Sequence, residues 1–156
     1  MKTGYTITAE SPYDPVSLEL LDELSAILKK MTGSSGKRSV DLTDFTSPDA
    51  VFIVARNESG IPVGCGGIRR ISARTGEIKR MYSKERGIGT EILKSLEKKA
   101  EELGYQALCL ETRRINKAAI SFYLKYGYRK IPNYGRYAGR PEAICFKKTL
   151  KPFRPG

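Results

Sequence analysis

The feature that most constrains this chain is a glycine turn, Gly87-Ile-Gly89, which joins an alternating segment, Glu77–Tyr82, to a helical segment, Ile88–Leu103. Glycine lets backbone N–H groups approach a ligand closely, and the positive end of the helix dipole points to the same place. Lys84 and Arg86 add positive charge beside the turn. The turn therefore indicates either an anion site, with phosphate as its natural ligand, or a tight strand–helix connection that binds nothing.

The length of the chain, 156 residues, fits one domain with a buried core. We expect a single domain over residues 1–150 and a short tail over 151–156. No apolar run approaches the roughly 20 residues that a membrane span needs. The N-terminal segment has no apolar signal core, so we expect a cytoplasmic protein that does not bind membranes.

Positive charge is concentrated in the second part of the chain. Residues 1–50 hold five basic and eight acidic residues, whereas residues 51–156 hold 23 basic and nine acidic residues. Such an excess attracts an anion, either nucleic acid or a small polyphosphate cofactor. The basic residues are dispersed and form no run of five or more, which argues against nucleic acid.

Cysteine and histidine usage excludes several kinds of catalytic site. Cys65, Cys109 and Cys145 lie far apart in strand-like apolar segments, so we expect buried, reduced thiols. The chain contains no histidine. This removes Ser-His-Asp and Cys-His arrangements as well as the usual zinc sites, and we expect no metal.

The apolar periodicity predicts an α/β (α+β) fold in which a mixed sheet carries helices on its faces. Residues 37–49 are polar, with one helical turn expected near Leu42–Phe45, and Pro132–Pro141 is a loop rich in Tyr, Gly and Arg. The predicted helices cover residues 15–31, 88–103 and 117–126. The predicted strands are Tyr5–Ala9, Ala50–Arg56, Pro62–Ile71, Glu77–Tyr82, Gln106–Thr112, Tyr128–Ile131 and Ala143–Leu150.

Four segments, taken in order, resemble the GNAT superfamily of acetyl-CoA-dependent N-acetyltransferases. They are Glu77–Tyr82, Gly87-Ile-Gly-Thr90, Leu110-Glu-Thr112 and Asn116–Tyr128. The resemblance implies a GNAT-type mixed central sheet with helices on both faces. The chain departs from the family in two respects: Lys84 occupies a position where Arg or Gln is usual, and the loop before the glycines is a few residues shorter.

The resemblance also implies a site for coenzyme A. Its pyrophosphate would lie on the N–H groups of residues 86–90, and its pantetheine arm would pair with the backbone of the third predicted antiparallel strand. Asn116 matches an asparagine that contacts this arm, although it also suits a plain helix N-cap. The implied cofactor-binding residues are Met81, Tyr82, Ser83, Lys84, Arg86, Gly87, Ile88, Gly89, Thr90, Asn116 and Tyr123.

Tyr123 matches the tyrosine of the family that protonates the departing thiolate. A free phenol has a pKa of about 10, close to that of an alkyl thiol, so this proton transfer is nearly balanced. The alternative is a packed aromatic beside the sulfur, and Tyr82, Tyr126 and Tyr128 are competing phenols. Tyr126 shares an apolar helix face with Phe122, which favours a place in the core.

Glu77 matches a position where some family members carry a general base, and a solvated strand-end residue is the alternative. Glu111 is the other carboxylate nearby, for which we expect a structural hydrogen bond. The backbone N–H near Met81 would stabilise the oxyanion.

Arg136, Tyr137 and Arg140 lie where family members close over the acceptor, and they suit an acidic or planar substrate. The resemblance implies direct transfer of acetyl from acetyl-CoA to a primary amine of a small molecule or a protein. Two alternatives stay open: a non-catalytic acyl-CoA-binding regulator of the same fold, and a basic nucleic-acid-binding domain. A homodimer is compatible with the sequence.

Overall fold

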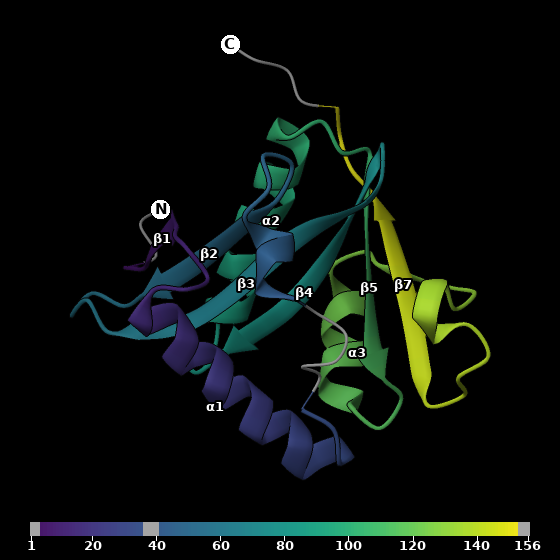
Figure 1. The fold of residues 1–156 in the computed structure, drawn as a ribbon, viewed down its shortest axis with the longest axis horizontal. Helices are drawn as coiled ribbons and strands as arrows, with labels where there is room; N and C mark the ends of the chain where they lie inside the picture. The colour runs from purple at the N-terminus through teal and green to yellow at the C-terminus, as the bar shows by residue number, and fades with distance from the viewer. Residues whose placement is uncertain (1–3, 36–40, 153–156) are drawn as a thin grey trace.

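A computed structural model describes residues 4–35 and 41–152 of the chain (Figure 1). The described residues form one seven-stranded sheet, three α-helices and two short 3-10 helices. In chain order these are β1 (Thr6–Ala9), α1 (Pro15–Thr32), η2 (Leu42–Phe45), β2 (Val51–Arg56), β3 (Pro62–Ser72), β4 (Thr75–Ser83), α2 (Ile88–Glu102), β5 (Ala107–Arg113), α3 (Lys117–Lys125), β6 (Arg129–Ile131), η3 (Gly135–Tyr137) and β7 (Ala143–Thr149). The predicted fold class and order of elements are confirmed.

The differences from the predicted elements are local. The helical turn expected at Leu42–Phe45 is η2, which begins with a capping box between Asp41 and Asp44. The loop 132–141 contains the short helix η3. Residues 37–40 of the polar segment and 153–156 of the tail lie outside the described residues. Within the described ranges, no helix is both long enough and apolar enough to cross a membrane.

The sheet has the strand order β1-β2-β3-β4-β5-β7-β6. All neighbouring strands are antiparallel except β4 and β5, which run parallel. The parallel ladder holds three residue pairs and ends where Glu77 lies opposite Cys109. Because β4 continues to Ser83 and β5 to Arg113, the two strands separate beyond this point and leave an opening in the sheet.

Helices cover both faces of the sheet, and alternation along β2 shows how each face is packed (Figure 1). Ile53 and Ala55 join the large core cluster together with α2 and Tyr123 of α3. Phe52 and Val54 point to the other face and join the cluster formed with α1 and η2. The two-residue period of a strand therefore gives the sheet two apolar faces.

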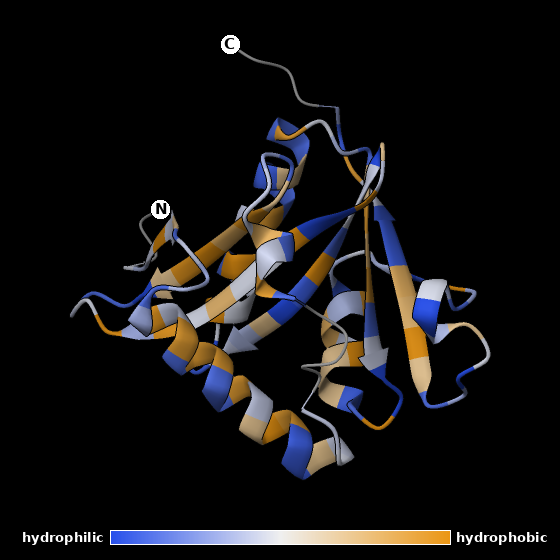
Figure 2. Ribbon diagram, viewed as in Figure 1, coloured by the Kyte–Doolittle hydropathy of each residue, from blue (hydrophilic) through white to orange (hydrophobic). Residues whose placement is uncertain are grey.

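Polar residues interrupt this hydrophobic pattern in the middle of β4. Figure 2 shows β2 coloured hydrophobic along most of its length, whereas β4 carries hydrophilic residues in its middle. Glu77, Lys79 and Arg80 are all buried. A buried charge is costly unless it is paired and hydrogen-bonded, so this part of β4 is a candidate functional region.

The helix after the glycine turn begins and ends at glycine-assisted caps. Gly87, at φ 91°, occupies the left-handed region at the N-cap of α2, and Ile88 immediately enters the core. Ile92, Leu96 and Ala100 continue the buried face. The helix ends at Glu102, one residue before the predicted end, and Leu103 is exposed.

Candidate active site

A cavity of about 470 Å³ lies in the opening between β4 and β5. Its walls come from both strands, from α1 and α3, and from the segment between β6 and β7. Beyond the short ladder, the β5-facing edge of β4 pairs with no strand of the described chain. A ligand with amide groups can therefore add to this edge as an extra strand would.

A bulge in β4 accompanies the separation of the strands. Lys79 pairs with Gly67 and Tyr82 with Cys65, so Arg80 and Met81 together lie opposite Gly66. Arg80 has φ 58° and is the one non-glycine residue in the described ranges with positive φ. Its guanidinium donates to Ser25 Oγ, to Leu21 O at 3.2 Å and to Ser35 O at 3.1 Å. A bulge bends its strand, and these contacts with α1 and the segment after it hold the bend in place.

A second cavity, of about 340 Å³, lies between the glycine turn and α3. Arg86, Gly87, Gly89 and Thr90, four of the predicted cofactor-binding residues, line it. The first N–H groups of a helix have no partner inside that helix. Within the described chain the N–H groups of Gly89 and Thr90 have no other acceptor, so they are available to an anion. Met81 and Ser83 also line this cavity.

Three of the predicted cofactor-binding residues lie elsewhere. Tyr82 donates its hydroxyl to Glu23 of α1 at 3.0 Å and lines neither cavity. Lys84 forms an ion pair with the same Glu23 carboxylate at 3.0 Å, and its N–H donates to Val63 O at 2.7 Å. Ile88 is buried in the core, and its N–H donates to Glu85 O at 3.3 Å.

Lys125, at the end of α3, lines the second cavity and was not predicted. It supplies the basic side chain that Lys84 does not. Glu85 also lines this cavity, but its carboxylate accepts from Tyr5 Oη and from Asn57 Nδ2, both at 3.3 Å. Tyr126, which was expected in the core, is half-buried and lines the cavity, with its hydroxyl 2.7 Å from Thr90 Oγ1.

Tyr123 lies where the two cavities meet. It lines both of them, together with Met81 and Ala119. Its ring is packed edge-on against Phe122 and Tyr128, with centroid distances of 5.2 and 5.5 Å. Burial raises the pKa of the Tyr123 hydroxyl, so the group keeps its proton at neutral pH. The hydroxyl is therefore in the protonated form that a general acid needs, and its raised pKa makes it a weaker acid than a free phenol.

Asn116 caps the N-terminus of α3, which was one of the two roles considered for it. Its Oδ1 accepts from Ala119 N–H at 3.2 Å at the start of α3. Asn116 also lines the cavity between β4 and β5. A role as helix cap and a position at the cavity wall therefore coexist in one residue.

The three predicted acceptor residues converge on the cavity between β4 and β5. Arg136, Tyr137 and Arg140 all line it, from η3 and the segment that follows. Tyr137 is buried, and its hydroxyl accepts from Lys79 Nζ at 2.5 Å. Burial lowers the pKa of Lys79, while the nearby Glu77 carboxylate partly opposes that change.

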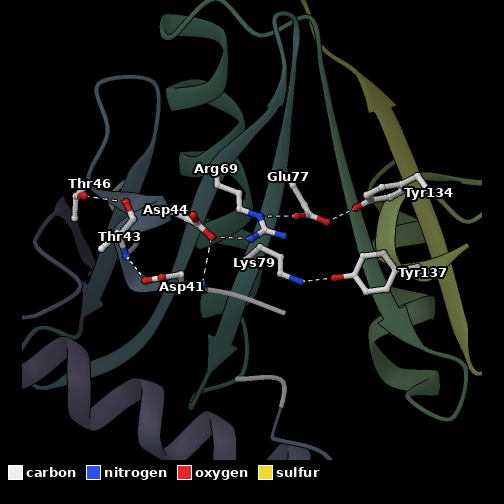
Figure 3. A network of polar contacts seen from close by, with 9 residues as sticks. All are labelled: Asp41, Thr43, Asp44, Thr46, Arg69, Glu77, Lys79, Tyr134 and Tyr137. Atoms are coloured by element: carbon white, nitrogen blue, oxygen red, sulfur yellow. Dashed lines mark hydrogen bonds and ion pairs between the residues drawn. The ribbon is translucent and has the colours of Figure 1, made fainter. Parts of the chain in front are cut away.

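Glu77 is buried in a polar network and does not line either cavity. One carboxylate oxygen accepts from Arg69 Nε at 2.8 Å, and the other accepts from Tyr134 Oη (Figure 3). Arg69 also forms an ion pair with Asp44 of η2 at 2.7 Å. Both oxygens of Glu77 are thus engaged, and its position suits a structural role better than proton transfer.

Glu111 on β5 is the carboxylate that lines the cavity. Burial raises its pKa, and the positive charges of Lys79, Arg113 and Arg136 partly oppose this shift. A carboxylate whose pKa lies above its ordinary value can accept a proton more readily. The geometry therefore favours Glu111 over Glu77 as a candidate general base.

The three cysteines are buried and unbridged, as predicted. Burial raises the pKa of Cys65 to about 12 and that of Cys109 to about 11, so these thiols stay protonated. In residues 4–35 and 41–152 no group of three or more Cys, Asp or Glu side chains is arranged to hold a metal ion.

Comparison with known proteins identifies the fold and the family. The sequence profile of the Acetyltransferase (GNAT) family matches residues 19–128. The chain is 34% identical over 150 residues to the IAA acetyltransferase of Azospirillum brasilense, covering 93% of this chain and 97% of that protein. It is 28% identical to the N-acetyltransferase YsnE of Bacillus subtilis, covering 85% and 91% of the two chains.

Solved structures agree with this result. A proposed acyl-CoA N-acyltransferase from Klebsiella pneumoniae superposes with a TM-score of 0.81 at 30% identity, covering 94% of this chain and 98% of that one. A GNAT acetyltransferase from Elizabethkingia anophelis with acetyl-CoA bound has the same fold, with a TM-score of 0.71 at 21% identity, covering 96% and 100%. From the profile match, the relatives and the shared fold, the chain belongs to the GNAT family of acetyltransferases.

Proposed function

We propose that this protein transfers the acetyl group of acetyl-CoA directly to a primary amine, with no acyl-enzyme. The observation that carries the proposal is that the two cavities meet at Tyr123. One cavity offers backbone N–H groups and basic side chains suited to phosphates, and the other is lined with charged groups suited to an acceptor. Protonated, buried thiols and the absence of histidine from the sequence argue against a covalent cysteine intermediate.

The residues that would hold coenzyme A fit its chemistry. Gly89 and Thr90 offer N–H groups to the pyrophosphate, and Arg86 and Lys125 add positive charge. The unpaired edge of β4 near Met81 and Ser83 offers backbone groups to the amides of the pantetheine arm. Gly87 has no atom within 4 Å of where a Cβ would stand, so the turn is open to a bulky ligand.

When bound, acetyl-CoA supplies an acetyl group already activated as a thioester. As the amine nitrogen bonds to the carbonyl carbon and the C–S bond breaks, the Tyr123 hydroxyl would give its proton to the leaving thiolate. Glu111 holds the proton that an acceptor ammonium gives up, which leaves a neutral, nucleophilic nitrogen. The backbone N–H groups near Met81 would orient the reacting carbonyl. These roles revise the expectation for Glu77, which we assign to structure.

The proposal is tested in two steps. At about one hundred times its Kd, a ligand of the native state adds about 2.7 kcal/mol of stability, which for a chain of this size raises Tm by about 5 °C or more. We expect this shift with acetyl-CoA and with CoA. Release of free thiol is then followed with a panel of primary amines.

The outcomes separate the remaining alternatives. A thermal shift with amine-dependent thiol release supports an acetyltransferase acting on that amine. A thermal shift without release for any amine would favour an acyl-CoA-binding regulator. Failure of both ligands to raise Tm, together with a shift caused by duplex DNA, would overturn the proposal in favour of a nucleic-acid-binding domain.

A further inference from the structure

The acceptor end of the cavity between β4 and β5 carries an excess of positive charge. Its lining includes five basic side chains and two acidic ones. Arg80 is occupied, because its guanidinium donates to groups of α1 and to Ser35 O. Lys79 is also engaged, because its ammonium donates to Tyr137 Oη. The other basic side chains of the lining are Arg113, Arg136 and Arg140, and the acidic ones are Glu111 and Glu142.

Arg113 supplies a buried donor that the protein leaves unsatisfied. Its Nε is buried and has no hydrogen-bond partner among the described residues. Leaving such a donor unpaired is costly, and the cost is larger for charged groups. Arg113 lies two residues after Glu111 on β5, so both side chains leave the strand on the same face. Arg113 also lines the cavity, so its guanidinium is one of the positive charges around that space.

Arg136 and Arg140 approach the same space from the segment between β6 and β7. A guanidinium offers parallel N–H donors that match the two oxygens of a carboxylate. The turn that carries them is fixed at Tyr137, which is buried and accepts a hydrogen bond from Lys79. Figure 3 shows this contact beside the Glu77–Tyr134 contact, so two tyrosines of the segment are held by two side chains of β4. The arginines are therefore presented by a segment that is already ordered.

Glu111 gives the same cavity a negative group among these cations. Lys79, Arg113 and Arg136 all act on it electrostatically. An ammonium group is attracted to this carboxylate, whereas an anionic group is attracted to the arginines. A ligand with both kinds of group matches the cavity, and a ligand with several positive charges does not.

We propose that the acceptor is an amine that also carries a carboxylate, as an amino acid or an amino-acid-like molecule does. Its nitrogen lies at Glu111, and its carboxylate is bound by Arg113, Arg136 and Arg140. The inference rests on the proposed acetyl transfer and names the class of acceptor for it. Polyamines and other polycationic amines are poor acceptors, because they bring further positive charge to the arginines.

The test compares acceptors that differ only in the carboxylate. Phenylalanine, phenylalaninamide and phenethylamine form one such set, alanine and alaninamide form another, and spermidine represents polycations. We expect kcat/KM for each free acid to exceed that of its amide by about tenfold or more, as one charge-assisted contact provides. Spermidine should be the weakest acceptor of the panel.

Two variants test which arginines bind the carboxylate of the acceptor, and a third variant controls for the loss of one positive charge. Arg113→Gln and Arg140→Gln should bring the acid-to-amide ratio of kcat/KM toward one. Arg129→Gln removes the same charge from exposed β6, outside the cavity lining, and should keep the wild-type ratio. A ratio that falls equally in all three variants would overturn the assignment, because it would report net charge alone.

A binding measurement keeps the inference separate from the proposed function. Calorimetry with CoA-saturated protein compares N-acetylphenylalanine with its amide, and we expect the acid to bind at least about tenfold more tightly. Equal or tighter binding of the amide, or faster acetylation of amides or spermidine, would overturn the acceptor class while leaving acetyl transfer intact. Failure of CoA to bind at all would overturn the proposed function and this inference with it.

Discussion

At the scale of single residues, the site depends on side chains that belong to the core and to a cavity wall together. Tyr123 is packed against two aromatic rings and lines both cavities. Asn116 caps α3 and lines the cavity between β4 and β5. Folding therefore places these groups before any ligand binds, which reduces the cost of ordering them later.

Replacement of Tyr123 by phenylalanine tests the role of its hydroxyl. General-acid catalysis contributes about 100-fold or more, so we expect kcat of Tyr123→Phe to fall by about that factor. The KM for acetyl-CoA should change little, because the ring and its packing remain. Steady-state kinetics with varied acetyl-CoA measures both values.

Tyr126→Phe is the matched comparison, because its hydroxyl lies 2.7 Å from Thr90 Oγ1 in the cavity beside the glycine turn. This variant should alter the affinity for acetyl-CoA more than turnover. Equal losses of affinity and turnover in Tyr123→Phe would argue that its hydroxyl organises the cofactor site and is not the acid.

The sequence predicts single residues well where local geometry decides their place. Gly87 could be predicted because a φ of 91° favours glycine, and the cap at Asn116 could be predicted because the first N–H groups of a helix need acceptors. Lys84 could not, because its ammonium is captured by Glu23, more than 60 positions earlier in the chain. Lys125 supplies the charge instead, and only the packing of α3 beside the turn brings it there. The sequence signal that could have identified Lys125 was its position near the end of the predicted helix 117–126.

At the scale of elements, β4 connects the two halves of the site. Two polar side chains of β4 hold the segment between β6 and β7 by hydrogen bonds. Glu77 accepts from Tyr134, and Lys79 donates to Tyr137. The bulge at Arg80 then bends the strand, and the part that follows offers its edge to the cavity. Glu77 was predicted as a base because it matches, at the start of the strand, a position where some family members carry one. The Arg69 and Tyr134 contacts that engage it come from other strands and loops, so strand position alone could not reveal them.

Replacing Glu77 and Glu111 one at a time separates a structural role from a role in proton transfer. Glu77→Gln removes one of the two carboxylates that pair with Arg69 and leaves Asp44 as the other. We expect a loss of about 2–3 kcal/mol in the free energy of unfolding. Urea denaturation measures this loss, and exposed Glu102→Gln is the control, for which we expect little change.

The pH dependence of kcat/KM tests Glu111. A base must be deprotonated to act, so activity should rise with pH through the Glu111 pKa, which burial places above the ordinary glutamate value. Glu111→Gln should remove this acidic limb and keep the limb that belongs to the substrate amine, whereas Glu77→Gln should keep both. Loss of the acidic limb in Glu77→Gln alone would return the role of base to Glu77.

At the scale of the whole molecule, fold and charge could both be predicted from the sequence. The order of strands and helices follows from apolar periodicity and turn residues, and the structure confirms it. The opening in the sheet could not be predicted, because strand lengths do not reveal how many residues of β4 and β5 pair. The excess of positive charge in residues 51–156 is a property of composition and acts over longer distances.

This charge predicts a salt dependence of cofactor capture. A positive molecule attracts the phosphates of acetyl-CoA, and salt screens that attraction as the Debye length falls from about 30 Å at 0.01 M to about 8 Å at 0.15 M. We expect KM for acetyl-CoA to rise severalfold over this range of salt. Acetyl-dephospho-CoA, which lacks one phosphate, is the control and should show a shallower rise. Identical slopes for the two thioesters would contradict a long-range electrostatic contribution.

The short ladder between β4 and β5 has a mechanical consequence. The sheet consists of an antiparallel half, β1 to β4, and a second antiparallel half, β5, β7 and β6, joined in backbone terms by three residue pairs. The inner ladders β2–β3, β3–β4 and β5–β7 hold six or seven pairs, and within the halves the edge strand β6 alone is held by as few as three. The seam between the halves is therefore the shortest ladder between inner strands, and it can widen at a smaller cost in hydrogen bonds than they can. A molecule that fills the seam acts as a missing strand, and filling it makes the two halves behave as one stiff sheet.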